Sequence, residues 1–345
     1  MTASQLTATL VTISAVLALL VLGKPLLLPL AVAAMIWYVI DAVAAAFAKL
    51  RIGDTYPLRR LSLLLALLLI VLLSMGVTEL VGDTVSQVRE AAPTYQHNVS
   101  RMLDKLSALT GIAVAPAVQQ FADQIDLGNV IGKIAAGIMS LAGDAGMVAI
   151  YVMFLLIEQR YFNIKFDALF PDADRRERVR AVIDHIQQQI RHYLFLKTLV
   201  SAATGILSYL VLRWVAVDYA AFWAFLIFLL NYIPTVGSLL GVAFPTVLAL
   251  VQFDTFTPFV VLATALGAVQ FVIGNILEPR LMGTSLNLSP LVVILSLALW
   301  GQLWGVVGMF LSVPLTVITM IILGHFPATR PVAVALSQNG EVQRD

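Results

Sequence analysis

Residues 219–252 read YAAFWAFLIFLLNYIPTVGSLLGVAFPTVLALVQ, an apolar segment that is interrupted in its middle by NYIPTVG at 231–237. A second apolar segment, 289–323, is interrupted by WGQLWG at 300–305. A pair of hydrophobic segments broken by Gly or Pro is the best sequence indication of a transport site in a secondary carrier. We therefore expect a membrane carrier whose substrate site lies at these two interruptions.

The composition predicts an integral membrane protein. The chain has 345 residues, of which 60% are hydrophobic and only 12% charged, whereas soluble domains carry about 25% charged residues. The apolar runs are long and continuous, which favours helices over barrel strands, so the expected fold class is all-α. Six full transmembrane helices are expected at about 5–22, 25–48, 60–81, 136–158, 196–214 and 257–277.

The placement of Lys and Arg predicts the orientation. Basic residues concentrate in the links 49–60 and 159–197, which the positive-inside rule assigns to the cytoplasm together with both termini. The run Leu6–Leu22 is expected to be retained as the first membrane helix. Residues 82–133 would then form external amphipathic helices that pack on the membrane helices or on a neighbouring subunit, and 172–195 a charged cytoplasmic helix.

The two interrupted segments are predicted to be re-entrant helical hairpins of opposite orientation, that is, an inverted repeat. Their first arms, 219–231 and 289–300, reach only about 20 and 18 Å at 1.5 Å per residue, too short for a hydrocarbon core of about 30 Å. The tips are expected to meet near the midplane, where exposed backbone is tolerated only against protein or water. The alternative is that these Gly and Pro residues serve helix packing alone.

The tips carry neutral hydrogen-bonding groups and aromatic rings, which suit a small, polar, largely neutral solute. The candidate substrate-binding residues are Asn231, Pro234, Thr235, Gly237, Trp300, Gln302 and Trp304. Ionisable groups in membrane segments are functional candidates by default. The candidate gating or coupling residues are Asp41, Asn275, Glu278 and Arg280.

Each ionisable candidate also has a purely structural interpretation. Asp41 is expected to pair with a nearby Lys or Arg, and Glu278 with Arg280 across Pro279. Lys197 is expected to extend its ammonium to the inner membrane surface. The sequence shows no Cys, no nucleotide-binding loop, no nucleophile–His pairing and no metal-ligand cluster. We therefore expect no enzymatic activity, cofactor or metal, and transport that runs on a gradient or downhill.

The motif Asn231-Tyr232-Ile233-Pro234 with Gly237, then GNILEPRLMG at 274–283 and Trp300-Gly301, resembles the autoinducer-2 exporter (AI-2E) family. This resemblance is specific from about 190 to 316. It implies export of autoinducer-2, a small polyhydroxylated quorum-sensing signal, across the bacterial inner membrane. It also implies an elevator mechanism and a homo-oligomer, in this family a pentamer, with lipid and small-molecule partners and no nucleic acid.

The expected domains follow from these assignments. Residues 1–81 would be scaffold helices, 82–135 external helices and 136–195 the fourth span with a cytoplasmic arm. The transport domain would cover 196–323, followed by a tail at 324–345. Two other functions stay open: a sodium(lithium)/proton antiporter of the same family using Asp41 or Glu278, and a non-transporting scaffold or receptor whose external helices bind a partner.

Overall fold

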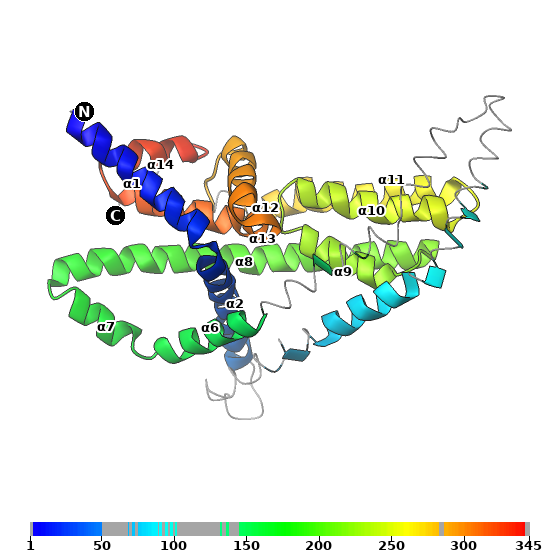
Figure 1. The fold of residues 1–345 in the computed structure, drawn as a ribbon, viewed down its shortest axis with the longest axis horizontal. Helices are drawn as coiled ribbons and strands as arrows, with labels where there is room; N and C mark the ends of the chain where they lie inside the picture. The colour runs from blue at the N-terminus through cyan, green and yellow to red at the C-terminus, as the bar shows by residue number, and fades with distance from the viewer. Residues whose placement is uncertain are drawn as a thin grey trace. The chain divides into compact units, whose positions relative to one another are not determined.

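The computed structural model describes residues 3–49, 68, 71–72, 75–88, 90–91, 94–95, 97–98, 101, 132, 136–137, 145–282 and 286–341. Within these ranges every regular element is a helix, and the one β-type contact is an isolated bridge between Leu288 and Ser337 (Figure 1). The long apolar runs thus form helices, in which all backbone groups away from the ends are hydrogen-bonded internally. The predicted all-α class is confirmed.

Two pairs of consecutive helices meet at sharp bends. Helix α1 (Ala3–Leu22) and α2 (Lys24–Lys49) meet at Gly23 with a bend of 81° between Ser14–Leu22 and Lys24–Ile40. Helices α6 (Ala145–Glu158) and α7 (Phe162–Leu169) meet at 69°. A Cβ at Gly23 would lie 2.4 Å from the Leu19 carbonyl oxygen, so this bend requires a glycine.

Helix α8 (Ala173–Val215) is a single helix of 43 residues, drawn in green in Figure 1. It joins the charged helix predicted at 172–195 to the span predicted at 196–214 without a break. The charged half and the apolar half of α8 therefore belong to one continuous helix, because the helical period is not interrupted where the composition changes.

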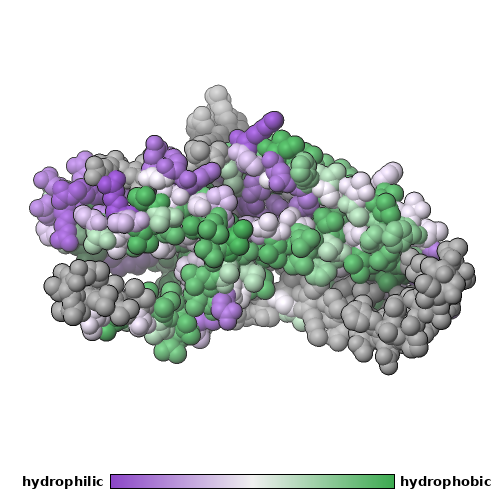
Figure 2. Space-filling model, turned by 90° about the horizontal axis from the view of Figure 1, so that it is seen from above, coloured by the Kyte–Doolittle hydropathy of each residue, from purple (hydrophilic) through white to green (hydrophobic). Residues whose placement is uncertain are grey.

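Three helical stretches are long and apolar enough to cross a membrane: α8, the run Thr257–Met282 and α13 (Pro290–His325). Each of the two bent pairs adds one more if it is counted as a single span. Hydrophobic residues cover much of the visible surface in Figure 2, as expected for helices that face lipid. The protein is a multi-pass membrane protein. The predicted span 60–81 lies largely outside the described residues, so the number six stays a prediction.

Contacts divide the chain into two compact units. Unit 1 comprises residues 1–66, 144–195 and 282–345, and unit 2 comprises 67–143 and 196–281. The first interrupted segment belongs to unit 2 and the second to unit 1. The division into five functional domains that we expect from the sequence stays a prediction.

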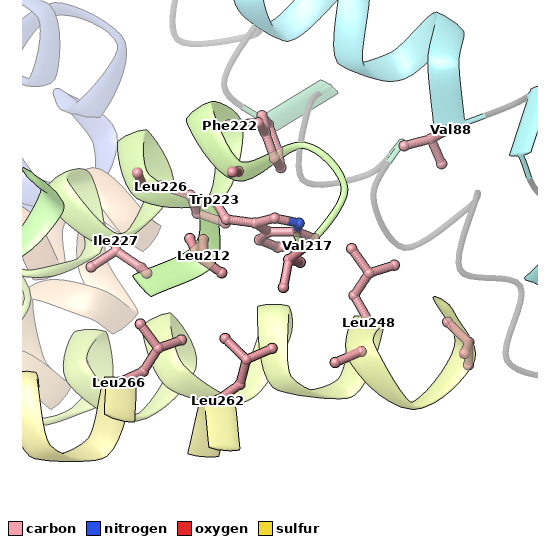
Figure 3. Close-up of a cluster of buried hydrophobic side chains, with 14 of the residues drawn as sticks. Val88, Leu212, Val217, Phe222, Trp223, Leu226, Ile227, Leu248, Leu262 and Leu266 are labelled. Atoms are coloured by element: carbon pink, nitrogen blue, oxygen red, sulfur yellow. The ribbon is translucent and has the colours of Figure 1, made fainter. Parts of the chain in front are cut away.

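The core of unit 2 is built around the first interrupted segment, which forms α9 (Ala220–Leu230) and α10 (Val236–Gln252). Figure 3 shows Phe222 and Ile227 of α9 above Leu262 and Leu266 of α11 (Thr257–Val272), with Leu248 of α10 beside them. All five side chains are almost fully buried. Between membrane helices such side chains stabilise the fold by close van der Waals packing, because the surrounding lipid is itself apolar.

The described part of the predicted external segment packs on the same core. Val81 and Val88, from helical residues 75–88, are buried among the side chains of α9 and α10. Asn98 donates to the carbonyl oxygens of Val251 and Gln252, which end α10. For these residues, packing on the protein's own helices is confirmed; the remainder of 82–133 lies outside the described residues.

The core of unit 1 lies between the second half of α13 and its neighbours. Val317 and Ile321 of α13 pack against Ile190 and Tyr193 of α8 and against Ala333 of α14 (Arg330–Leu336). The Ser289 N–H donates to the Leu336 carbonyl oxygen at 3.0 Å, which ties the start of α13 to the end of α14. The second interrupted segment is thereby anchored at its base.

Candidate functional site

The first interrupted segment is a helical hairpin whose turn runs from Asn231 to Thr235. A Cβ at Gly237 would lie 1.7 Å from the Leu230 carbonyl oxygen, so the two arms touch directly at the turn. Further from the turn, the rings of Trp223 and Phe244 stack across the arms with centroids 6.3 Å apart. The chain reversal predicted at 231–237 is confirmed, and Gly237 is required by the close approach of the backbones.

The hairpin turn itself is partly buried and partly open. Asn231 is buried and donates from Nδ2 to the Ser201 hydroxyl of α8 at 3.0 Å. Pro234 is half-buried and Thr235 is exposed, with a φ of 60° and a ψ of −54°. A non-glycine residue with positive φ costs of order 1–3 kcal/mol and is typical of functional turns. Of these residues, Thr235 presents its side chain to the outside of unit 2.

The second interrupted segment also reverses direction, because α13 consists of two helical arms joined by a kink at Gly305. Gly305 has a non-helical backbone with φ 68° and ψ −148°. The indole Nε1 of Trp300 donates to the Thr316 hydroxyl at 3.2 Å, whereas sixteen residues of straight helix would separate them by about 24 Å. A Cβ at Gly308 would lie 2.0 Å from the Trp300 carbonyl oxygen. The reversal predicted at 300–305 is confirmed.

The candidate residues of this second turn differ in exposure. Trp304 is buried and donates from Nε1 to the Leu20 carbonyl oxygen of α1 at 3.1 Å, just before the bend at Gly23. Trp300 is half-buried, with its ring centroid 5.2 Å from that of Trp304. Gln302 is exposed. The amide of Gln302 and the free face of Trp300 are therefore the groups that this turn offers to a solute.

Helix α8 contacts the first hairpin and the start of α12 (Glu278–Met282) through neighbouring side chains. Lys197 Nζ lies 2.5 Å from Glu278 Oε1, and only 5% of the lysine side chain is exposed. One residue later, the Thr198 hydroxyl lies 2.7 Å from the Tyr232 hydroxyl, and Ser201 accepts from Asn231. The hairpin turn and the ion pair are thus held by a single stretch of α8, 197–201.

Two expectations for the ionisable residues are wrong. Lys197 does not extend to a surface, because a carboxylate partner lies beside it within unit 2. Glu278 pairs with Lys197 rather than with Arg280, which is exposed. The helical geometry explains this, since Glu278 and Arg280 are two residues apart and therefore do not face each other.

Two further coupling candidates are Asn275 and Asp41. Asn275 is exposed and lies in the π-helical turn η1 (Ile273–Leu277), directly before α12 (Glu278–Met282). π-turns are rare and are frequent at functional sites. Asp41 lies within α2, but its side chain is outside the described residues. Glu278, with Lys197, is the candidate that the described geometry places in a defined contact.

The sequence analysis missed a buried polar stripe on α8 that includes Lys197, Ser201, Thr204 and Ser208. Their spacing of four, three and four residues places them on one face of the helix. Among the described residues, neither the Ser208 hydroxyl nor the buried Gln270 amide nitrogen of α11 has a hydrogen-bond partner. The spacing was present in the sequence and is the signal that could have identified this stripe.

The candidate residues therefore form two groups. Asn231, Pro234, Thr235, Gly237, Asn275, Glu278 and Arg280 lie in unit 2, and Trp300, Gln302 and Trp304 in unit 1. Each group is assembled within its own unit. The predicted meeting of the two tips around one pocket stays a prediction.

Comparison with known proteins identifies the family of the chain. The family model described as "AI-2E family transporter" matches residues 10–328. The "AI-2 transport protein TqsA" of Escherichia coli K12 is 34% identical over 264 residues, 74% of this chain and 74% of its own length. A Haemophilus influenzae protein named "Putative transport protein" is 32% identical over 286 residues, 80% of this chain and 81% of its own length.

A Borreliella burgdorferi protein, also named "Putative transport protein", is 36% identical over 200 residues, 58% of this chain and 55% of its own length. The family match covers both hairpins and the stretch of α8 that contacts the first of them. On this evidence the chain belongs to the AI-2E transporter family.

Proposed function

We propose that this protein is a secondary carrier that exports a small, polar, neutral signal molecule of the AI-2 type. The family match makes it a transporter, and the Escherichia coli relative is named for transport of AI-2. The observation that carries the proposal further is that both hairpin turns, 231–237 and 300–305, contain no charged residue. Uncharged donors and acceptors with aromatic rings match a polyhydroxylated neutral solute better than an ion.

The solute would be held where the two turns come together. Thr235 and Gln302 are exposed and supply a hydroxyl and an amide, while Trp300 supplies a ring face. Asn231, Pro234, Gly237 and Trp304 shape the turns from within their own units, through the contacts described above. In an elevator mechanism the hairpins carry the solute past a scaffold, and each hairpin closes the site towards one side of the membrane.

Glu278 is the proposed coupling or gating residue, acting with Lys197. Removing one charge of a buried ion pair leaves the other uncompensated, which is strongly unfavourable. Loss of this pairing would therefore weaken the hold of α8 on the start of α12, where Asn275 and Arg280 flank the contact in sequence. Asp41 stays a second coupling candidate. The sodium(lithium)/proton antiporter is not favoured, since the relative with an assigned substrate is named for AI-2.

The proposed setting is the inner membrane of a bacterium, with both termini in the cytoplasm and a homo-oligomeric, pentameric assembly. The basic links 49–60 and 159–197 support the orientation through the positive-inside rule. The oligomer and the role in quorum sensing are proposed from the resemblance of the sequence motifs alone.

Uptake of labelled autoinducer-2 into inside-out membrane vesicles tests this function. Replacing Gln302 by Ala removes one hydrogen-bonding amide from the proposed site, and we expect uptake at limiting solute to fall by about fivefold to tenfold, the equivalent of about 1–1.5 kcal/mol. Gln188→Ala, which removes an exposed amide from the charged half of α8, is the matched control and should leave uptake unchanged.

Two results would contradict the proposal. Absence of autoinducer-2 uptake by the wild-type protein would exclude the substrate, and wild-type uptake by Gln302→Ala would exclude this residue from the site. Equal expression of the variants in the membrane is verified by quantitative immunoblotting.

A further inference from the structure

Unit 2 contains a cavity of about 420 Å³ that is separate from the hairpin turn, and we call it the α8–α9 cavity. Its walls come from helical residues 75–88, from the last turns of α8 and from the turn that joins α8 to α9. Its polar lining consists of Thr84, whose hydroxyl donates to the Leu80 carbonyl oxygen, and of Asp83, Gln87, Tyr209, Arg213, Asp218 and Tyr219. The pairs Asp83–Gln87 and Tyr209–Arg213 are each four residues apart, so each pair occupies one helix face.

The cavity opens to the surface, and part of its lining is apolar. Val217, Ala220 and Phe222 line it and are buried, and Val217 and Phe222 lie in the core shown in Figure 3. Apolar lining with a few placed polar groups is common in small-molecule sites, where the polar groups fix the orientation of the ligand.

The wall formed by the α8–α9 turn is strained and held in place. Ala216 and Tyr219 have φ angles of 62° and 57°, which are uncommon for residues other than glycine. Gln252 of α10 fixes the turn, because its Oε1 accepts from the Asp218 N–H and its Nε2 donates to the Ala216 carbonyl oxygen, both at 2.8 Å. Strain maintained by surrounding contacts is typical of ligand sites.

Asp218 is positioned by a second contact. The Tyr95 hydroxyl donates to Asp218 Oδ2 at 2.8 Å and lies 3.2 Å from the Tyr219 hydroxyl. Burial raises the pKa of Tyr95, and the neighbouring Tyr219 and Asp218 raise it further, so the phenol stays neutral and remains a donor. One carboxylate oxygen of Asp218 is thereby fixed, which orients the other.

Three polar side chains of the cavity are exposed at its open side. Asp83, Gln87 and Arg213 make no hydrogen bond or ion pair with any other residue in the described part of the chain, so their polar groups are free to contact a ligand. In particular, Arg213 does not pair with Asp83 or Asp218, although all three line the same cavity. The cavity therefore offers two carboxylates, one guanidinium and one amide beside the rings of Tyr209 and Tyr219.

We propose that the α8–α9 cavity is a second binding site, specific for a small neutral polyol. Adjacent hydroxyl groups of such a ligand would donate to the carboxylates of Asp83 and Asp218. Arg213 would donate to the hydroxyl or carbonyl oxygens of the ligand, because a guanidinium has five donors and no acceptor. Tyr209 would cover the carbon skeleton. This site goes beyond the proposed transport site, since the two share no residue.

Binding of D-ribose to the purified full-length protein in detergent micelles tests the proposal. We expect saturable binding by isothermal titration calorimetry. The double variant Asp83→Asn, Arg213→Gln should weaken it by at least about tenfold, because two charge-assisted contacts are lost. Arg178→Gln, which changes another exposed arginine of α8 remote in sequence from the cavity, should bind as the wild type does.

The outcomes separate this site from the transport site. Asn231→Ala, at the first hairpin turn, should leave D-ribose binding unchanged even where it abolishes autoinducer-2 transport. The proposal is overturned if the wild-type protein shows no saturable binding of D-ribose, or if the double variant with unchanged thermal unfolding binds it as the wild type does. Tighter binding of the zwitterion L-glutamine than of D-ribose would overturn the assigned ligand class.

Discussion

At the scale of single residues, the close approach of two backbones decides which positions must be glycine. Gly237 and Gly308 are each followed by a helical arm that lies against the preceding one, with a carbonyl oxygen at 1.7 and 2.0 Å from the position of a Cβ. Neither glycine needs a positive φ, since both have ordinary helical backbones. The sequence pattern identified Gly237 as part of a turn, but only the structure shows which atom excludes a side chain at Gly237 and at Gly308.

Gly237→Ala is expected to open or distort the first hairpin, because the added methyl group would overlap the Leu230 carbonyl oxygen. Overpacking of this kind costs about 1–3 kcal/mol or more, so we predict a lower midpoint of thermal unfolding in detergent and reduced transport. Gly267→Ala on α11 is the control, since nothing lies within 4 Å of its Cβ position. Equal stability of the two variants would contradict the close contact at the hairpin turn.

At the scale of elements, α8 is the helix that positions the candidate site in unit 2. Its residues 197–201 contact Glu278, Tyr232 and Asn231 in order. The sequence predicted the existence of the two hairpins and the interruptions that form their turns. It did not predict the partners of Lys197 or Asn231, because helical periodicity fixes which residues share a face and leaves open which neighbouring helix covers that face.

Helix α13 shows which part of a hairpin can be predicted from residue types and which part cannot. Its hydropathy pattern is uniform on both sides of Gly305, so length alone would favour one long span. The reversal was expected from Trp300-Gly301-Gln302 and Gly305, whose residue types disfavour a straight apolar helix. The bond between Trp300 and Thr316 could not be predicted, because it depends on the register between the arms.

A double-mutant cycle tests the contact between α8 and the start of α12. Lys197→Met leaves the Glu278 carboxylate without its cation, and we expect a loss of about 3 kcal/mol in the free energy of unfolding. Lys197→Met combined with Glu278→Leu removes both charges and should recover part of that loss. The measurement is thermal or denaturant unfolding in detergent. Additive effects of the two substitutions would show that the pair is not coupled.

At the scale of the whole molecule, the two hairpins belong to separate compact units, and the first unit contains α1, α2 and α6 as well as the second hairpin. A carrier that works by alternating access needs two bodies that move relative to each other around one site. In the proposed mechanism, both hairpin turns must therefore reach the same solute during transport. Thr235 and Gln302 are exposed on their own units and are suited to test this claim.

Cysteine cross-linking in native membranes is the most direct measurement, since the chain contains no Cys of its own. We expect the double variant Thr235→Cys, Gln302→Cys to form an intramolecular cross-link with a short bis-maleimide, and autoinducer-2 to change its rate. The control pair Thr235→Cys, Gln188→Cys should not react in this way. A shared site at the two hairpin turns would be contradicted by one result. In every transport condition, the control pair would be cross-linked efficiently, and no cross-link would form between positions 235 and 302.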